Sequence, residues 1–217
     1  MIAIIPSLLV QNEAQFLTQI QGLGLAVTQV QIDIADGIFV SQTTWADPSV
    51  IKNHLQVDCE LHLMVADPLK ILTSWRQVSQ VQRILVHLES VPNLIAILPK
   101  LRAYGWAISL VLNPETPVSA LDPYLDSITG VMFMGVHPGR QAQAFIPETL
   151  DKIREFKRKK TTHFVEIDGG VNLTTLPGII AAGVDGICPG SAIFGNNKSP
   201  KENVEEMRKK IASLTNE

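Results

Sequence analysis

The chain has 217 residues, of which 46% are hydrophobic and 18% are charged, which is enough apolar material for one large core. This composition excludes an intrinsically disordered chain, whose few apolar residues cannot offset the entropy lost on folding. The 18 Lys and Arg residues against 21 Asp and Glu residues give a formal net charge of −3, so we expect neither nucleic acid nor an anionic membrane surface as a partner.

Short runs rich in Ile, Val, Leu and Phe alternate with longer amphipathic segments along the chain. We predict eight buried strands, at Ala3–Leu8, Gln29–Ile34, Glu60–Met64, Arg83–His87, Ala107–Leu112, Gly130–Met134, His163–Ile167 and Gly186–Cys188. The predicted helices between them include Asn12–Leu23, Pro68–Ser79, Asn93–Tyr104, Pro147–Lys160, Leu173–Ala182 and Lys201–Leu214.

This alternation of strands and helices is typical of a parallel sheet. Eight units at a repeat of about 27 residues predict an α/β fold, a single (β/α)8 TIM barrel that forms one domain over residues 1–217. A doubly wound open sheet is the alternative, but the Gly-x-Gly-x-x-Gly turn that would favour it does not follow the first predicted strand.

The two cysteines and the N-terminal segment bear on the cellular compartment. Cys59 and Cys188 lie in apolar runs and are predicted to be buried free thiols, which fits a reducing cytoplasm. The first basic residue is Lys52, so the positively charged start of a secretory signal is missing, and no apolar run reaches the ~20 residues that span a bilayer. We expect a cytoplasmic protein without a membrane partner.

Polar residues gather at or just after the ends of the predicted strands. They are Ser7, Asp33, Asp36, His62, His87, Asn113, His137 and Asp168. A single residue of this kind often caps a helix or holds a turn. In a barrel, however, the carboxyl ends of all strands converge on one mouth, so eight such residues predict a functional site there.

Two aspartates and a histidine suggest the chemistry of this site. Asp33 and Asp168 follow the second and seventh predicted strands, from which one carboxylate can reach each face of a bound substrate. Inverting a carbon centre requires such a pair of acid/base groups. His62 is a candidate ligand for a divalent Zn, Fe, Mn or Co ion that would stabilise an enediolate, with a hydrogen-bonded core histidine as the alternative.

Two glycine-containing turns are candidates for binding a phosphate group. Gly169 and Gly170 follow the seventh predicted strand, whereas Gly190 and Ser191 follow the eighth, and both turns precede apparent helix starts. Barrels frequently bind phosphate at these two loops, through backbone N–H groups. The alternative is that the glycines only allow tight turns.

Segments in the same order through nearly the whole chain resemble the ribulose-phosphate 3-epimerase family. The segments are Pro6–Leu9, Asp33–Val40, Leu61–Val65, Val86–Glu89, Leu112–Pro117, Val136–Gly139, Phe145–Pro147, Glu166–Asn172 and Gly190–Gly195. The resemblance implies a (β/α)8 barrel that interconverts D-ribulose 5-phosphate and D-xylulose 5-phosphate with a divalent metal held by two His and two Asp residues.

Carried over by motif, the resemblance makes Asp33 and Asp168 the metal-bound acid/base pair and His62 a further metal ligand, with Gln31 at the position of the family's other metal histidine. We predict substrate contacts at Ser7, His62, Met64, Met134, Gly139, Arg140, Gly169, Gly170, Gly190 and Ser191. Self-association into a homo-oligomer is an expectation from the resemblance alone.

The departures from the family pattern surround the predicted site. An amide oxygen such as that of Gln31 is neutral and suits zinc less well than imidazole does. Gln141–Ala142 replaces the glycine pair of the loop after the sixth strand, where Arg140 offers a guanidinium group that matches phosphate geometry. Ala35 and Ile38 stand where the family has Met and His, and Ser41–Gln42 where it has Pro-Asn.

The leading hypothesis is therefore an isomerase, a metal-assisted epimerase that acts on D-ribulose 5-phosphate. Two alternatives stay open: an epimerase for another ketose phosphate, and a binding protein for sugar phosphates that lost turnover with its full metal site. A sugar-phosphate lyase or decarboxylase is a weaker hypothesis, because those enzymes want an Asp-x-Lys-x-x-Asp spacing and Asp33–Asp36 contains no Lys.

Overall fold

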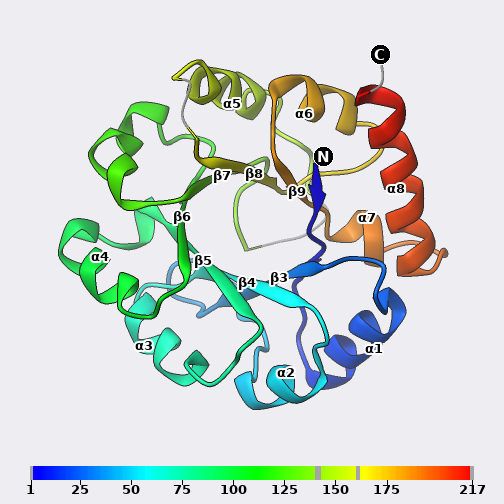
Figure 1. Ribbon diagram of the computed structural model, residues 1–217, viewed down its shortest axis with the longest axis horizontal. Coiled ribbons are helices and arrows are strands. Elements are labelled where there is room, and N and C mark those ends of the chain that lie inside the picture. The colour runs from blue at the N-terminus through cyan, green and yellow to red at the C-terminus, as the bar shows by residue number, and fades with distance from the viewer. Residues whose placement is uncertain (1, 140–142, 160–161, 216–217) are drawn as a thin grey trace.

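A computed structural model describes residues 2–139, 143–159 and 162–215 of the chain. Nine parallel strands form one sheet in the order β1-β9-β8-β7-β6-β5-β4-β3-β2. They are β1 (Ala3–Ile4), β2 (Ser7–Leu8), β3 (Gln29–Ala35), β4 (Asp58–Met64), β5 (Val81–His87), β6 (Ala107–Leu112), β7 (Gly130–Met134), β8 (Phe164–Asp168) and β9 (Gly186–Cys188). The helices surround this ring of strands (Figure 1).

The first predicted strand is two short strands in the structure, and it closes the barrel. β1 pairs with β9, and β2 pairs with β3. Pro6 lies between them. Its carbonyl accepts a hydrogen bond from the backbone N–H of Gln31 at 2.9 Å, and the backbone N–H of Ile5 donates to the Ile187 carbonyl on the other side. One extended segment therefore joins the two edges of the sheet. The eight-unit barrel is confirmed, and the open doubly wound sheet is wrong.

The alternation of side chains along each strand separates two environments. On β3, Val30, Ile32 and Ile34 face outward into the main core that the helices cover, whereas Gln31 and Asp33 face the barrel interior. The interior also holds a small apolar cluster, formed by Ile5, Leu85, Val111, Met132, Met134 and Cys188. Polar residues of the strands are thus concentrated inside the barrel, which is where the site forms.

Eight α-helices occur among the described residues, most of them in the outer layer (Figure 1). They are α1 (Glu13–Leu23), α2 (Pro48–His54), α3 (Pro68–Leu72), α4 (Leu94–Arg102), α5 (Thr149–Arg158), α6 (Leu176–Ala182), α7 (Ser191–Phe194) and α8 (Pro200–Thr215). Asn12, Asp47, Asp67 and Asn93 cap α1 to α4 by accepting backbone N–H bonds.

One predicted helix is shorter in the structure, and one connection is a 3₁₀ segment. The helix expected over Pro68–Ser79 ends at Leu72 and continues only as a 3₁₀ turn to Trp75. The hydroxyls of Thr73 and Ser74 donate to carbonyls of the preceding turn, which is how such residues compete with a regular helix. Between β6 and β7, where no helix was predicted, the chain forms a 3₁₀ segment, Val118–Ser127.

The prediction of two buried free thiols is confirmed, because Cys59 and Cys188 are both buried and unpaired with each other. Among the described residues, no helix combines the length and the apolar character that a membrane crossing needs.

Candidate active site

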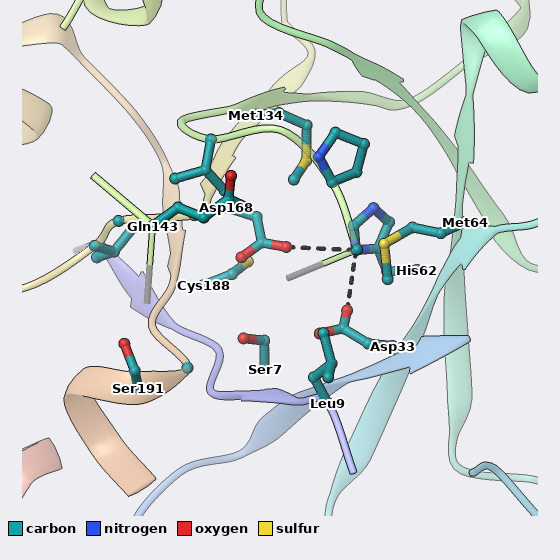
Figure 2. Close-up of a pocket in the computed structure, with 17 residues that line it drawn as sticks. Ser7, Leu9, Asp33, His62, Met64, Met134, Gln143, Asp168, Cys188 and Ser191 are labelled. Carbon is teal, nitrogen blue, oxygen red and sulfur yellow. Dashed lines mark hydrogen bonds and ion pairs between the residues drawn. The ribbon is translucent and has the colours of Figure 1, made fainter. Parts of the chain in front are cut away.

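The predicted acid/base pair meets at one end of the barrel. Asp33 lies near the end of β3 and Asp168 is the last residue of β8, and both side chains are buried. Nδ1 of His62 lies 3.0 Å from Oδ1 of Asp33 and 3.4 Å from Oδ2 of Asp168, as the dashed lines of Figure 2 indicate. The three side chains come from three different strands and converge on one point.

These three residues are also the candidate metal ligands. One donor atom from each of Asp33, His62 and Asp168 lies within 4.8 Å of the others, which is close enough for all three to bind a single ion. Two carboxylate oxygens and one imidazole nitrogen form a donor set that divalent cations accept. The structure thus brings together three of the four predicted ligands in a ligand-like arrangement.

The fourth predicted ligand, Gln31, lies deeper in the barrel and presents its NH₂ group. Nε2 of Gln31 donates to Oδ1 of Asp33 at 2.8 Å and to Oδ2 of Asp168 at 2.9 Å. Oε1 of Gln31 is buried without a hydrogen-bond partner among the described residues. Turning the amide end for end would exchange these two atoms and direct the carbonyl oxygen at the place where a cation would bind.

Burial and neighbouring charge set the protonation of this group. Burial alone lowers the pKa of His62, but hydrogen bonds to Asp168 and Asp33 outweigh it and raise the pKa to about 9. Burial raises the pKa of Asp33, and the charge of Asp168 adds to this effect while His62 opposes it. Without a cation, the site therefore favours a protonated His62 that offsets part of the carboxylate charge.

A pocket opens above these residues and contains most of the predicted substrate contacts (Figure 2). Predicted residues that line it are Ser7, Asp33, His62, Met64, Met134, Gly139, Asp168, Gly169, Gly170, Gly190 and Ser191. Lining residues that were not predicted as part of the site are Leu9, Val136, Pro138, Gln143, Val171 and Cys188. Arg140, also predicted to contact substrate, lies outside the described residues.

Backbone conformation and close packing explain the two glycines of the turn after β8. Gly169 and Gly170 adopt φ values of +96° and +68°, a region that side chains other than glycine rarely adopt. A Cβ atom on Gly169 would come within 2.4 Å of Val136, and one on Gly170 within 2.9 Å of Phe145. Tight backbone packing alone is therefore sufficient to require glycine at both positions.

A second polar cluster lies below the site, inside the barrel. Arg83 donates to Glu166 at 2.8 Å and to Glu60 at 3.3 Å, and both glutamates are fully buried. Burial raises the pKa of Glu166 to about 7, although the charge of Arg83 opposes the shift. Burial also raises the pKa of Glu60 well above its usual range, and the charge of Glu166 adds to it. Sequence analysis missed this cluster, because an isolated Glu or Arg in a strand gives no sign of a partner.

The raised pKa of Glu166 predicts a pH dependence of stability. The folded protein keeps a proton that the unfolded chain loses at lower pH, so this contribution is present below pH 4.5 and is lost as the pH rises toward about 7. Glu166→Gln cannot ionise, so its unfolding free energy should decline less between pH 5 and pH 7 than that of the wild type. Urea titrations at both pH values measure the difference; equal declines in the two proteins would contradict this assignment.

Comparison with known proteins places this site in a family. The family model described as "Ribulose-phosphate 3 epimerase family" matches residues 3–194. The ribulose-phosphate 3-epimerase of Escherichia coli K12 is 32% identical over 205 residues, which cover 91% of this chain and 90% of that protein. The chain belongs to the ribulose-phosphate 3-epimerase family. The enzyme of that name from Bacillus subtilis is 31% identical over 216 residues, covering 96% of this chain and 99% of its own length.

Membership of the ribulose-phosphate 3-epimerase family makes the chain an isomerase of the epimerase type, as the sequence analysis predicted. Solved structures confirm the fold of this epimerase-family chain. KGPDC from Streptococcus mutans superposes with a TM-score of 0.76 at 13% identity over 98% of both chains. A mutant tryptophan synthase α-subunit from Pyrococcus furiosus gives a TM-score of 0.67 at 20% identity, covering 99% of this chain and 98% of its own. At these identities the likeness bears on the barrel alone.

Proposed function

We propose that the protein interconverts D-ribulose 5-phosphate and D-xylulose 5-phosphate, with Asp33 and Asp168 as the acid/base pair. The observation that carries the proposal is the convergence of these two buried carboxylates on one pocket, with His62 between them. Epimerisation at C3 requires one group that removes a proton from one face and another that returns a proton to the opposite face. Family membership supports the same reaction.

The proton transfers follow from one ionised and one protonated aspartate. The ionised carboxylate takes the C3 proton, the electron pair of the broken C–H bond moves toward the C2 carbonyl, and an enediolate forms. The second aspartate then donates its proton to the other face of C3. Two carboxyl groups buried next to each other favour such a shared-proton state, because two adjacent negative charges repel.

Three donor groups of the site fit a divalent cation, and Gln31 becomes a fourth donor if its amide turns. The buried Oε1 of Gln31 has no partner among the described residues, so on that side the turn breaks no hydrogen bond. Asp33, His62, Asp168 and Gln31 would then hold the ion, which supplies positive charge that stabilises the enediolate. When Gln31 presents its NH₂ group, that group and a protonated His62 are the donors that face the carboxylates.

The remaining pocket residues position the substrate in this proposal. Met64 and Met134 border the pocket with apolar side chains that exclude water from the intermediate. Ser7 and the backbone of the Gly170 and Ser191 turns also line the pocket, and their hydrogen-bond donors would bind the phosphate group. The role of Arg140 at the phosphate stays a prediction.

A protein that binds sugar phosphates without turnover is the second candidate, and one observation favours it. The Gln31 NH₂ group bridges both carboxylates, which lowers their capacity to accept a proton or a cation. In this case a ketose phosphate would raise the melting temperature without reacting, because a ligand that binds only the folded state stabilises it.

The experiment that separates the two candidates measures proton exchange. The protein is supplied with D-ribulose 5-phosphate in D₂O, with Zn²⁺, Fe²⁺, Mn²⁺ or Co²⁺ in turn and with no metal, and NMR follows deuterium at C3 and the formation of D-xylulose 5-phosphate. We expect both signals to appear. If the sugar phosphate raises the melting temperature but no C3 exchange occurs under any condition, the result contradicts the epimerase proposal and supports a binding protein without turnover.

A further inference from the structure

A second histidine, His87 at the end of β5, lies behind His62 on the side away from the aspartates. The Nε2 atoms of the two rings are 2.9 Å apart, and both side chains are fully buried. Two imidazole nitrogens at this distance form a hydrogen bond only if one carries a proton and the other presents its lone pair. The direction of this hydrogen bond therefore decides whether Nε2 of a neutral His62 carries the proton or whether Nδ1, which faces the aspartates, carries it.

The surroundings of His87 determine that direction. Its other nitrogen, Nδ1, lies 3.6 Å from Oε2 of Glu89, and the side chain of Asn113 also interacts with the ring. Burial lowers the pKa of His87 to about 4, so near neutral pH the ring carries a single proton. The Glu89 carboxylate near Nδ1 favours the proton on that atom, which leaves Nε2 of His87 as an acceptor. On the other side of the pair, Nε2 of Gln31 lies 3.3 Å from Nδ1 of His62 and can donate to the lone pair left there.

Glu89 is itself held in place as an anion. Burial raises its pKa, but the nearby His87 ring and the hydrogen bonds from the Thr116 hydroxyl and the Asn113 backbone N–H outweigh burial, and the pKa is lowered overall. Oε1 of Glu89 accepts from the Asn113 N–H at 2.9 Å and from the Thr116 hydroxyl. Phe39 packs against the His87 ring, with centroids 4.9 Å apart. The carboxylate and the ring are therefore both fixed.

We propose that His87 and Glu89 are positioning residues of the epimerase site, which keep a proton on Nε2 of His62 and so direct its Nδ1 at Asp33 and Asp168. This role rests on the proposed function, because it serves catalysis only if the site performs the epimerisation. With Nε2 protonated, the lone pair of Nδ1 faces Nε2 of Gln31 at 3.3 Å, and it can bind a cation once that amide turns or take up a second proton that pairs with the carboxylates. A neutral His62 with its only proton on Nδ1 would be unable to bind the cation.

Three substitutions of His87 separate this role from simple packing. An amide at the end of a Gln side chain reaches the position of the histidine Nε2, whereas that of Asn reaches only the position of Nδ1. His87→Gln therefore keeps an acceptor for His62, and His87→Asn and His87→Leu remove it. His163→Gln is the matched control, because His163 is a partly buried histidine that bonds the Leu125 carbonyl, away from the site.

The first measurement is ¹⁵N–¹H NMR of the histidine rings in the protein without added metal, which reports the proton on Nε2 of His62 directly. The spectra are recorded over a range of pH, and the comparison is made where the His62 ring carries one proton. We expect this proton on Nε2 in the wild type, in His87→Gln and in His163→Gln, and on Nδ1 in His87→Asn and His87→Leu. A proton that stays on Nε2 of His62 in the Asn and Leu variants would overturn the proposal.

The second measurement is calorimetric titration with Zn²⁺ alone. Loss of a partner that orients a metal-binding histidine costs about 10- to 100-fold in affinity, so we expect that loss for His87→Asn and His87→Leu and a near wild-type value for His87→Gln. Equal losses in all three variants would show a packing effect and overturn the proposal. Should the Asn and Leu variants fail to fold, Glu89→Gln takes their place, with a smaller expected loss because Asn113 remains.

The two proposals fail in different ways. A wild-type protein that neither exchanges the C3 proton nor binds Zn²⁺ contradicts the proposed function, whereas the NMR comparison still decides whether His87 sets the proton on His62.

Discussion

Asp168→Asn should lower kcat for epimerisation by about 10³-fold, because an amide cannot take or return a proton and acid/base groups contribute about 10²- to 10⁴-fold. Asp33→Asn should have a similar effect. The amide keeps the size of the carboxyl group, so the barrel is expected to fold. The measurement is kcat in both directions with purified enzyme, together with deuterium incorporation at C3.

The exchange experiment gives the sharper result. If each aspartate serves one face of C3, either variant should still exchange the C3 proton of one epimer while losing exchange of the other, and the two variants should differ in which epimer they keep. Asp47→Asn is the matched control: Asp47 caps α2, and Asn caps a helix about as well as Asp does. Loss of exchange from the same epimer in both variants would contradict the two-face mechanism.

Gln31→His is expected to raise the affinity for Zn²⁺ by about tenfold or more, because imidazole suits zinc better than a neutral amide oxygen does. In the wild type, the Gln31 NH₂ group must also leave both carboxylates before its oxygen can act as a ligand. A histidine at this position would offer an imidazole nitrogen as the ligand and would have no NH₂ group to move away from the carboxylates. Calorimetric titration and the metal content of the purified protein measure the change.

Gln29→His is the matched control for this substitution. Gln29 lies two residues earlier on β3 and donates to Glu60 at 2.8 Å, in the lower part of the barrel, so its replacement should leave zinc affinity unchanged. Equal zinc affinity of Gln31→His and the wild type would show that Gln31 does not limit metal binding, and the fourth donor would have to be sought elsewhere.

The barrel and the main residues of its mouth follow from local features of the sequence. Alternation of β-rich runs with amphipathic helices is a short-range property, and it predicted all eight strand segments. The end of a parallel strand then places its last polar residue at the mouth, as for Asp33 and Asp168. Helix limits were less predictable, since the hydroxyls of Thr73 and Ser74 compete with the backbone for hydrogen bonds.

Side-chain contacts between neighbouring strands could not be predicted from the sequence. His87 was noted as a polar residue at a strand end, but its role as partner of His62 depends on the register of β4 against β5, which no local pattern reports. The same holds for Arg83 between its two glutamates. In both cases the decisive neighbour is more than twenty residues away.

The sequence by itself determined the fold, the family and the identity of the groups that can perform acid/base chemistry, because these depend on periodicity and on residue type. The tertiary structure alone decided that the Gln31 side-chain amide lies between two carboxylates and that His62 contacts His87, which in turn lies beside Glu89. The physical reason is that hydrogen bonds and pKa values depend on distances of a few ångströms, and only the closed barrel sets those distances.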